Sequence, residues 1–222
     1  MSKLRDDLGM RIGTWNMDGR RGDRSRTFLL ARDCDVLLLT EVPVDLELEG
    51  YELAADSEVM VPGRRWAAIA SRTPLKPCAV PHPASAAAIV EGVTYVSSVL
   101  PWAGSGGAPP WDGPDHAART ANALAALAPF LREQPELVWG GDWNHSLVDR
   151  EHAGSNAGRA RLLALLEELG LAVPTRELPH RLAGVYSIDH IAIRRTGAEA
   201  RHVPAIDADG ALSDHDFYAV EY

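Results

Sequence analysis

The sequence predicts an α+β fold, because strand-like and helix-like segments both occur along the whole chain. Short apolar runs at 35–42, 65–71 and 136–139 are typical of buried β-strands. Two segments in the second half instead repeat apolar residues at helical spacing. The 222 residues contain no internal repeat, low-complexity tract or linker, so we expect one domain over residues 1–222.

The first part of the chain predicts two strands that each end in a polar residue. Residues 10–16 form a short strand ending at Asn16, followed by a loop rich in glycine and arginine and by a helix near Phe28. Residues 35–42 are almost continuously apolar, which indicates a strand covered on both faces, yet Glu41 lies at its carboxyl end. A buried strand rarely contains a glutamate without a function.

Strands are also expected farther along the chain. Prolines at 74 and 77 should close the strand at 65–71. The other candidates are 51–59, 92–100, 187–193 and 213–222.

A long loop and two helices complete the expected elements. Residues 101–115 contain several glycines and prolines, and an irregular loop of this length in a compact domain is more often functional than not. A helical pattern begins at about Asp115 and has Pro135 beyond its end. A second amphipathic helix covers 159–170, and we expect Ser155 to be its N-cap.

The composition is that of an ordinary globular protein. With 46% hydrophobic and 24% charged residues, the chain can bury a sizeable core. Its start lacks the apolar stretch of a signal peptide, and no run approaches the ~20 apolar residues that span a bilayer. We therefore expect a soluble, cytoplasmic protein with no membrane partner. Cys34 and Cys78 show no zinc-binding spacing and are expected to be small buried or half-buried residues.

The charge argues against one class of nucleic-acid-binding protein. A net charge of −9 and a pI near 5.3 exclude coating of nucleic acid through bulk positive charge. They do not exclude a nuclease, because a hydrolase that holds a divalent metal through carboxylates is locally acidic and needs only a few phosphate contacts.

The segment GGDWNH, residues 140–145, is the strongest candidate for a functional site. Asp142 and Asn144 follow the apolar run at 136–139 and are two positions apart, so in a strand both would point into the same pocket. The two preceding glycines allow another backbone or a phosphate to approach closely. Alone, these residue types are equally typical of a solvated turn. Polar residues after other predicted strands favour the functional interpretation.

Five short strings in order carry a resemblance to a known superfamily. They are TWN ending at Asn16, LLLTE ending at Glu41, GDWN with Asp142 and Asn144, IDHI with Asp189, and SDH with Asp214 and His215. Their order and spacing resemble the endonuclease/exonuclease/phosphatase superfamily, which includes DNase I-like nucleases, abasic-site endonucleases, inositol-phosphate phosphatases and sphingomyelinases. The resemblance implies a four-layer α/β/β/α sandwich, in which two packed mixed β-sheets are flanked by helices.

The resemblance also implies catalytic roles. Asp142 and Asn144 would orient and deprotonate the attacking water and hold the phosphoryl oxygens. His215, oriented by Asp189, would stabilise the pentacovalent phosphorane. Asn16 would order a metal-bound water or contact the nucleophile. These roles agree with the chemistry, because a histidine backed by a carboxylate has a fixed tautomer and a raised pKa.

A divalent metal is part of the same implication. Glu41 would be the principal ligand for Mg²⁺ or Mn²⁺, and Asp214 would complete the metal or water network together with Asn16. Carboxylate oxygens are suitable ligands for such hard cations. Arg20 in the first loop and Arg159 near the second helix are candidate phosphate-binding residues, although a solvated surface position explains an arginine equally well.

The sequence departs from the family pattern at the end of the strand at 92–100. Nucleases of the family commonly carry a histidine, or a tyrosine and asparagine group, where this chain has Val99. Protonation of the leaving oxygen would then fall to a metal-bound water, to Trp102 in the following loop, or to His116. Trp102 is also a candidate substrate contact.

Three functions are compatible with these residues. The first is a metal-dependent phosphodiesterase acting on DNA or RNA. It is favoured by the DNase-like spacing of the strings and by the arginines at 20, 21, 24, 26, 64 and 65, and disfavoured by the acidic balance and by Val99. The second is a phosphatase or diesterase for a small phosphorylated metabolite or lipid head group. The third, a catalytically silent binding domain, is disfavoured because all five strings keep their metal and phosphate groups. The sequence leaves the oligomeric state open.

Overall fold

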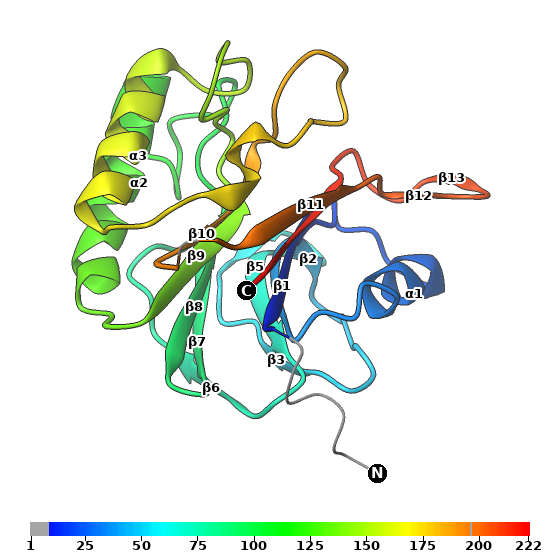
Figure 1. Ribbon diagram of the computed structural model, residues 1–222. Helices are drawn as coiled ribbons and strands as arrows, with labels where there is room; N and C mark the ends of the chain where they lie inside the picture. The colour runs from blue at the N-terminus through cyan, green and yellow to red at the C-terminus, as the bar shows by residue number, and fades with distance from the viewer. Residues whose placement is uncertain (1–8, 196) are drawn as a thin grey trace.

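The computed structural model describes residues 9–195 and 197–222, and two mixed β-sheets dominate it (Figure 1). The larger sheet is built from β1 (Arg11–Asn16), β2 (Val36–Pro43), β3 (Glu52–Ala54), β4 (Val59–Val61), β5 (Arg64–Ser71), β11 (Glu199–Val203) and β14 (Phe217–Glu221). Its order is β11-β14-β1-β2-β5-β3, with β4 also paired to β5. The neighbours β1 and β2 are parallel, and the other pairs are antiparallel.

The smaller sheet has the order β10-β9-β8-β7-β6. Its strands are β6 (Leu75–Cys78), β7 (Ser85–Val90), β8 (Val93–Ser98), β9 (Leu137–Asp142) and β10 (Asp189–Ile193). Only β8 and β9 run parallel within it. A separate two-stranded ribbon consists of β12 (Ile206–Asp207) and β13 (Gly210–Ala211).

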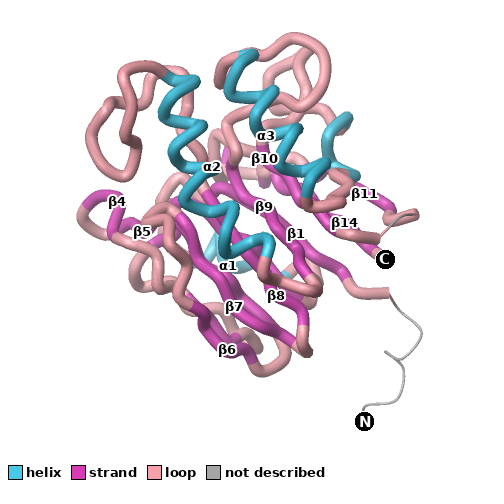
Figure 2. Tube along the Cα trace, turned by 90° about the vertical axis from the view of Figure 1, so that its left-hand side faces the viewer, coloured by secondary structure: helices cyan, strands magenta, loops and turns pink. Residues whose placement is uncertain are grey.

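The helices lie outside the two sheets, as the two views show (Figure 1, Figure 2). Asp115 caps α2 by accepting a hydrogen bond from the Ala118 N–H, and Ser155 caps α3 by accepting one from the Gly158 N–H. The expected N-cap role of Ser155 is therefore confirmed. The helices are α1 (Asp23–Leu30), α2 (His116–Arg132), α3 (Asn156–Glu168) and the short 3₁₀ helix η1 (Pro174–Glu177).

Three buried clusters fill the spaces between the four layers. In β2, Leu38 points into the cluster between the two sheets, whereas Leu37 and Leu39 point toward α1. On the far side, Trp139 of β9 packs against leucines of α2 and α3. Each fully buried leucine contributes about 1.5–3 kcal/mol relative to an exposed one. The near-continuous apolar run at 35–42 thus has a physical reason, since both faces of β2 are covered. The predicted α/β/β/α sandwich is confirmed.

Some expected elements differ from the structure. The segment 51–59 is not one strand. It contains β3 (Glu52–Ala54), and β4 begins at Val59 after a break in the strand geometry. Pro77 does not close β5; it lies inside β6, an edge strand, where a missing N–H is tolerated. The alanine-rich β7 was not expected, because alanine favours helices and gives no strand signal. The expected strand at 213–222 begins only at Phe217, so the SDH string lies in a loop.

The strand directions bring the polar residues at the strand ends together at one end of the two packed sheets, called the rim below. Asn16 and Glu41 lie together because β1 and β2 are parallel, with Asn16 paired to Thr40. Asp142 ends β9 and pairs with Asp189, which begins the antiparallel β10. His215 precedes β14, whose antiparallel pairing with β1 places its amino end beside the carboxyl end of β1.

The two glycines before Asp142 allow close packing of the backbone. A Cβ on Gly140 would lie 2.4 Å from the His190 carbonyl oxygen, and one on Gly141 would lie 2.3 Å from that of Ser98. Gly141 also has a φ of +118°, which only glycine adopts readily. The sequence suggested that these glycines allow the close approach of either another backbone or a phosphate. The fold accounts for the close approach of another backbone.

Glu151 anchors the loop that follows β9. Its Oε1 accepts backbone hydrogen bonds from Ser146, His152, Ala153 and Gly154, and its Oε2 lies 3.0 Å from His145 Nδ1. Burial alone would raise the pKa of Glu151, but the hydrogen bond from His145 and those from the backbone outweigh it and lower the pKa to about 2.

We expect Glu151→Gln to reduce the free energy of unfolding by about 2 kcal/mol at pH 7. The native carboxylate has a pKa below that of the unfolded chain, so its stabilisation is present above about pH 4.5 and is lost as the pH falls toward 2. Urea unfolding of both proteins at pH 7 and at pH 3.5 measures the difference. An equal difference at both pH values would show that the Glu151 charge does not stabilise this loop.

Candidate active site

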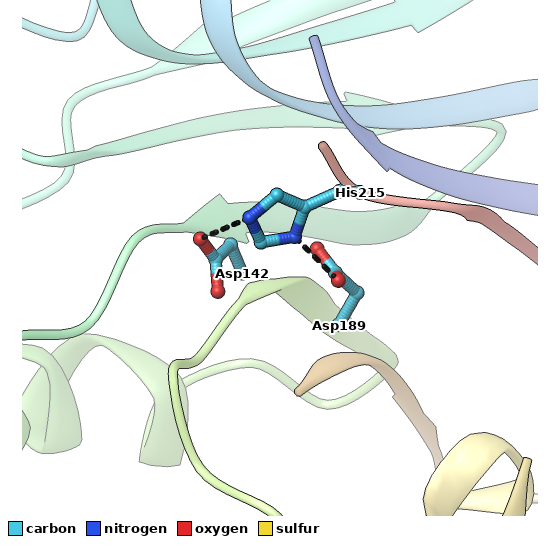
Figure 3. Close-up of side chains that lie close together, drawn as sticks. All are labelled: Asp142, Asp189 and His215. Atoms are coloured by element: carbon cyan, nitrogen blue, oxygen red, sulfur yellow. Dashed lines mark hydrogen bonds and ion pairs between the residues drawn. The ribbon is translucent and has the colours of Figure 1, made fainter. Parts of the chain in front are cut away.

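His215 lies between two buried aspartates at the rim (Figure 3). Its Nδ1 is 2.8 Å from Asp189 Oδ2, and its Nε2 is 3.9 Å from Asp142 Oδ2. The hydrogen bond to Asp189 places a proton on Nδ1 and fixes the plane of the ring. Nε2 is therefore the ring nitrogen that faces Asp142, at a distance longer than a hydrogen bond.

The loop that carries His215 is attached to the end of β1. Ser213 Oγ donates to the Asn16 carbonyl oxygen at 2.7 Å and accepts from the His215 N–H at 3.1 Å. Trp15 Nε1 donates to the His215 carbonyl oxygen at 3.2 Å. The position of the imidazole is thus set by the first strand, almost 200 residues earlier in the chain.

Asn16 connects Glu41 with Asp142. Its Nδ2 donates to Glu41 Oε1 at 3.1 Å and to Asp142 Oδ2 at 3.0 Å, and its Oδ1 accepts from the Asp18 N–H at 2.9 Å. Asn16 is only 1% exposed, so these bonds lie in a buried setting where they are strong. The amide joins the acid at the end of β2 to the acid at the end of β9.

The buried charges shift one another's pKa values. Burial raises the pKa of Asp142 and of Asp189, although the positive charge of His215 partly opposes this in both. Burial also raises the pKa of Glu41, against the hydrogen bond from Asn16. Burial alone would lower the pKa of His215, but the charges of Asp189 and Asp142 outweigh it, and the pKa lies well above its ordinary value. The two aspartates thus favour the cationic form of His215.

Asn144 lies beside Asp142 for a reason other than strand alternation. β9 ends at Asp142, and Asn144 has a φ of +52°, which ends the strand geometry. The Asn144 N–H donates to Asp142 Oδ1 at 3.1 Å, while Nδ2 donates to the Leu100 carbonyl oxygen at 3.0 Å. The expectation that Asn144 continues the strand two residues after Asp142 is wrong, and a loop places Asn144 instead.

Asp214 lies at the edge of the group and is exposed. Its Oδ1 is 3.4 Å from Ser213 Oγ, and its charge is among those that raise the pKa of His215. Within the described residues, the three whose ligand atoms lie within 4.8 Å of one another are Asp142, Asp189 and His215. Asp214 thus borders the cluster, and its role in metal binding stays a prediction.

Arg64 was expected only as one of the arginines that favour a nucleic-acid substrate, and not as a partner of Glu41. Asp18 was not expected at this rim. Arg64, the first residue of β5, forms an ion pair with Glu41 and lies 3.3 Å from Asp18 Oδ1. In the sequence, Arg64 is one of many arginines. Only the antiparallel pairing of β2 with β5, which sets Pro43 opposite Arg64, brings it to Glu41.

Two further histidines lie near His215 and were expected to be structural or surface residues. The ring of His180 is edge-on to that of His215 at 6.4 Å between centroids, and the ring of His152 is edge-on to His180 at 5.3 Å. Burial and the charge of His215 lower the pKa of His180 to about 4. A neutral imidazole thus borders the cationic one, and no spacing in the sequence relates them.

The three candidate substrate-binding residues lie apart from this cluster. Arg20 donates to Asp18 Oδ2 at 3.1 Å, and Arg159 donates to the Asp149 carbonyl oxygen and to Asn156. Trp102 packs edge-on against a neighbouring tryptophan, with 36% of its surface exposed. Within the described part of the chain, no hydrogen bond or ion pair links any of the three directly to the aspartates around His215.

His116 is engaged by structural hydrogen bonds. Its Nε2 lies 2.8 Å from the Pro101 carbonyl oxygen, which can only accept, and its Nδ1 lies 2.9 Å from Ser155 Oγ. Burial lowers the pKa of His116, so the ring is neutral with its proton on Nε2. Val99 is buried in the core beneath the helices. Neither residue presents a free proton donor to the rim.

Comparison with known proteins agrees with this arrangement. Residues 13–215 match the Endonuclease/Exonuclease/phosphatase family. The chain belongs to this family. The resemblance inferred from the five strings is thereby confirmed, and family membership identifies the chain as a phosphoester hydrolase. No curated protein matches the sequence.

Solved structures show the same fold in family nucleases. The 3′–5′ exonuclease NExo from Neisseria meningitidis has a TM-score of 0.71 at 21% identity, covering 96% of this chain and 99% of its own. The Neisseria 3′ phosphatase NExo bound to a product DNA hairpin has the same TM-score and coverages at 23% identity. An AP endonuclease from Archaeoglobus fulgidus has a TM-score of 0.70 at 17% identity, with coverages of 96% and 99%.

The rim residues fit the divalent metal on which family enzymes generally depend. Asp142 and Asp189 are almost fully buried, and Asp189 Oδ1 has no hydrogen-bond partner in the described structure. Such an oxygen is unfavourable unless a cation or a proton neutralises it. The donor set at the rim consists mainly of carboxylate and amide oxygens, which hard cations prefer.

In the described residues no helix is both long enough and apolar enough to cross a membrane.

Proposed function

We propose that this protein is a divalent-metal-dependent phosphodiesterase that cleaves DNA or RNA through in-line attack of an activated water. The observation that carries the proposal is the arrangement of Asp142 and the His215–Asp189 pair across a buried rim, with Asn16 linking Asp142 to Glu41. This set contains a proton acceptor, a cationic hydrogen-bond donor and oxygen ligands for a metal, as phosphoester hydrolysis requires.

In the proposed reaction, Asp142 accepts the proton of the attacking water. Burial raises its pKa, which makes it a stronger base than an exposed aspartate, while Asn16 and the Asn144 N–H hold its two oxygens in place. His215 donates from Nε2 to a non-bridging phosphoryl oxygen and stabilises the charge that develops there. Asp189 keeps the imidazole protonated and oriented.

We propose Mg²⁺ or Mn²⁺ as the cofactor, held by Glu41 with help from Asn16 and Asp214. When bound, such an ion neutralises the non-bridging oxygens and lowers the pKa of a coordinated water. Asp142 and His215 then need only move protons and hold the phosphoryl group. Neither Val99 nor His116 protonates the leaving oxygen. Val99 is a buried apolar residue, and both ring nitrogens of His116 are engaged in structural hydrogen bonds.

Two observations support nucleic acid as the substrate. A hollow of about 100 Å³ beside the end of β1 is lined by three arginines, Arg20, Arg21 and Arg26. Arginines of this kind contact phosphates without reading sequence. The structurally similar NExo is bound to a product DNA hairpin.

A second candidate, a phosphatase or diesterase for a small phosphorylated metabolite or lipid head group, is favoured by the charges around that hollow. The arginines of the first loop are paired with carboxylates, namely Arg20 with Asp18, Arg21 with Asp45, Arg24 with Asp207 and Arg26 with Asp23. Paired arginines attract a phosphate backbone less strongly, and the net charge of −9 acts in the same direction.

A substrate panel distinguishes the two candidates. With Mg²⁺ or Mn²⁺ we expect the purified protein to nick supercoiled plasmid or to degrade single-stranded DNA, RNA or an abasic duplex. Because phosphate contacts release counterions, the rate should fall several-fold between about 50 and 200 mM salt. Turnover restricted to monoesters or small diesters would favour the second candidate. No turnover of any substrate with either metal would contradict both.

A further inference from the structure

Arg64 joins two carboxylates at the rim. Its Nη1 pairs with Glu41 Oε2, and its Nη2 donates to the Asp18 carbonyl oxygen at 2.8 Å and lies 3.3 Å from Asp18 Oδ1. The other carboxylate oxygen of Glu41 accepts from Asn16. Both oxygens of Glu41 therefore have partners, and the guanidinium supplies a positive charge to them.

The geometry of this group is fixed by the backbone around it. Glu41 and Asp18 have φ values of +50° and +48°, which are unusual for residues other than glycine. Gly19 packs so closely that a Cβ there would lie 2.3 Å from Arg64 Nε, and its N–H donates to the Glu41 carbonyl oxygen at 2.8 Å. Backbone strain of this kind persists only where surrounding contacts enforce it.

The ion pair is also more enclosed than the other arginine pairs of this face. The side chains of Arg64, Glu41 and Asp18 are 25%, 18% and 29% exposed, whereas those of Arg20 and Arg21 are 57% and 54% exposed. A partly enclosed pair is screened less by solvent and salt than a surface pair. Arg64 thus acts on Glu41 more strongly than the loop arginines can.

The Arg64 guanidinium and a divalent metal cannot both bind Glu41 Oε2. Two cations within about 4 Å of each other repel strongly where solvent screening is incomplete. Both the guanidinium and the metal ion bind carboxylate oxygens, so they compete for the same carboxylate. A metal that approaches Glu41 must therefore displace Arg64 or bind beside its charge.

We propose that Arg64 is a resident counter-ion that competes with the divalent metal for Glu41, while it also holds Asp18. It keeps the two carboxylates together and neutralised before the metal binds, and it weakens the binding of the metal. Arg64 is thus a positioning residue for the metal ligands. This inference rests on the proposed function, because that function places the metal at Glu41.

Calorimetric titration with Mn²⁺, in the absence of any substrate, tests the competition. We expect Arg64→Gln to bind Mn²⁺ about tenfold more tightly than the wild type, because one positive charge leaves the site. Arg64→Lys keeps the charge but cannot span both carboxylates, so its affinity should lie between the two. Arg21→Gln removes an equal charge from the same face without touching Glu41, and should leave the affinity within about twofold.

Thermal unfolding supplies a second measurement. In EDTA we expect Arg64→Gln to have a lower Tm than the wild type, because Glu41 and Asp18 then repel each other, and we expect Mn²⁺ to raise its Tm by more. Equal or weaker Mn²⁺ binding by a folded Arg64→Gln protein would overturn the proposal, as would equal gains in Arg64→Gln and Arg21→Gln. If Arg64→Gln does not fold, Arg64→Lys decides between these outcomes. A wild-type protein that hydrolyses no substrate would defeat the proposed function and leave this binding comparison intact.

Discussion

Asp142→Asn is expected to lower kcat by about 10³-fold on the substrate that the wild type hydrolyses best. Asparagine has the same shape as aspartate, but its amide cannot accept a proton from the attacking water. It also places an NH₂ group or a neutral oxygen where the carboxylate now accepts from Asn16. The loss should therefore appear in kcat more than in KM, because the variant keeps the shape of the side chain and loses the base.

The fold should survive this change, which makes the kinetic result interpretable. Asp142 is a buried acid beside another buried acid, so its neutralisation relieves repulsion with Asp189 while it weakens the attraction to His215. We expect the far-UV circular dichroism to be unchanged and the Tm to shift by only a few degrees. Asn144→Ala, two residues beyond the end of β9, serves as a comparison that changes a neighbouring candidate residue and keeps the carboxylate. Full turnover by a folded Asp142→Asn protein would reject the assigned role.

Asp189→Asn is expected to move the basic limb of the pH–rate profile to lower pH and to reduce kcat at pH 8 by about 10²-fold. Burial alone would lower the pKa of His215, and the negative charge of Asp189 is the largest influence that raises it. The cationic ring is present below its pKa and is lost as the pH rises through it. With the charge of Asp189 removed, this pKa falls, so the active form disappears at a lower pH.

The titration of His215 can be followed directly by NMR of its ring protons in both proteins. We expect the pKa of His215 in Asp189→Asn to fall below that of the wild type, since burial disfavours the cation and the largest opposing charge has been removed. His180→Gln provides a matched control, because it changes the neighbouring ring and leaves both aspartates in place. An unchanged His215 pKa in Asp189→Asn would mean that Asp142, and not Asp189, sets the charge of the ring.

Much of the fold and part of the site could be predicted from the sequence. The run at 35–42 predicted a doubly covered strand, and the layers on both sides of β2 are its physical cause. Polar residues at strand ends could be grouped because the carboxyl ends of parallel strands meet at one edge of a sheet. Asn16 and Glu41 follow this rule in the larger sheet. Asp189 instead begins β10 and lies opposite Asp142 because β9 and β10 are antiparallel. The catalytic roles of these residues stay predictions.

Other parts of the site depend on information that no local pattern contains. Arg64 reaches Glu41 through strand register, and His180 reaches His215 through the loop before β10. Asn144 lies beside Asp142 as expected, but not as part of the strand, because β9 ends at Asp142 and Asn144 has a left-handed backbone. Asp18 lies in a loop dominated by arginines, where an aspartate is an ordinary turn residue and gives no signal of a functional site.

The central claim is that Asp142 and His215, far apart in the chain, act on one phosphorus atom as one unit. The most direct measurement compares kcat for Asp142→Asn, His215→Ala and the double variant on one substrate. We expect each single change to cost about 10³-fold and the double change to cost little more than the worse of the two, because groups that act as a unit are strongly non-additive. Wild-type turnover in either single variant, or single losses that multiply in the double variant, would contradict the claim.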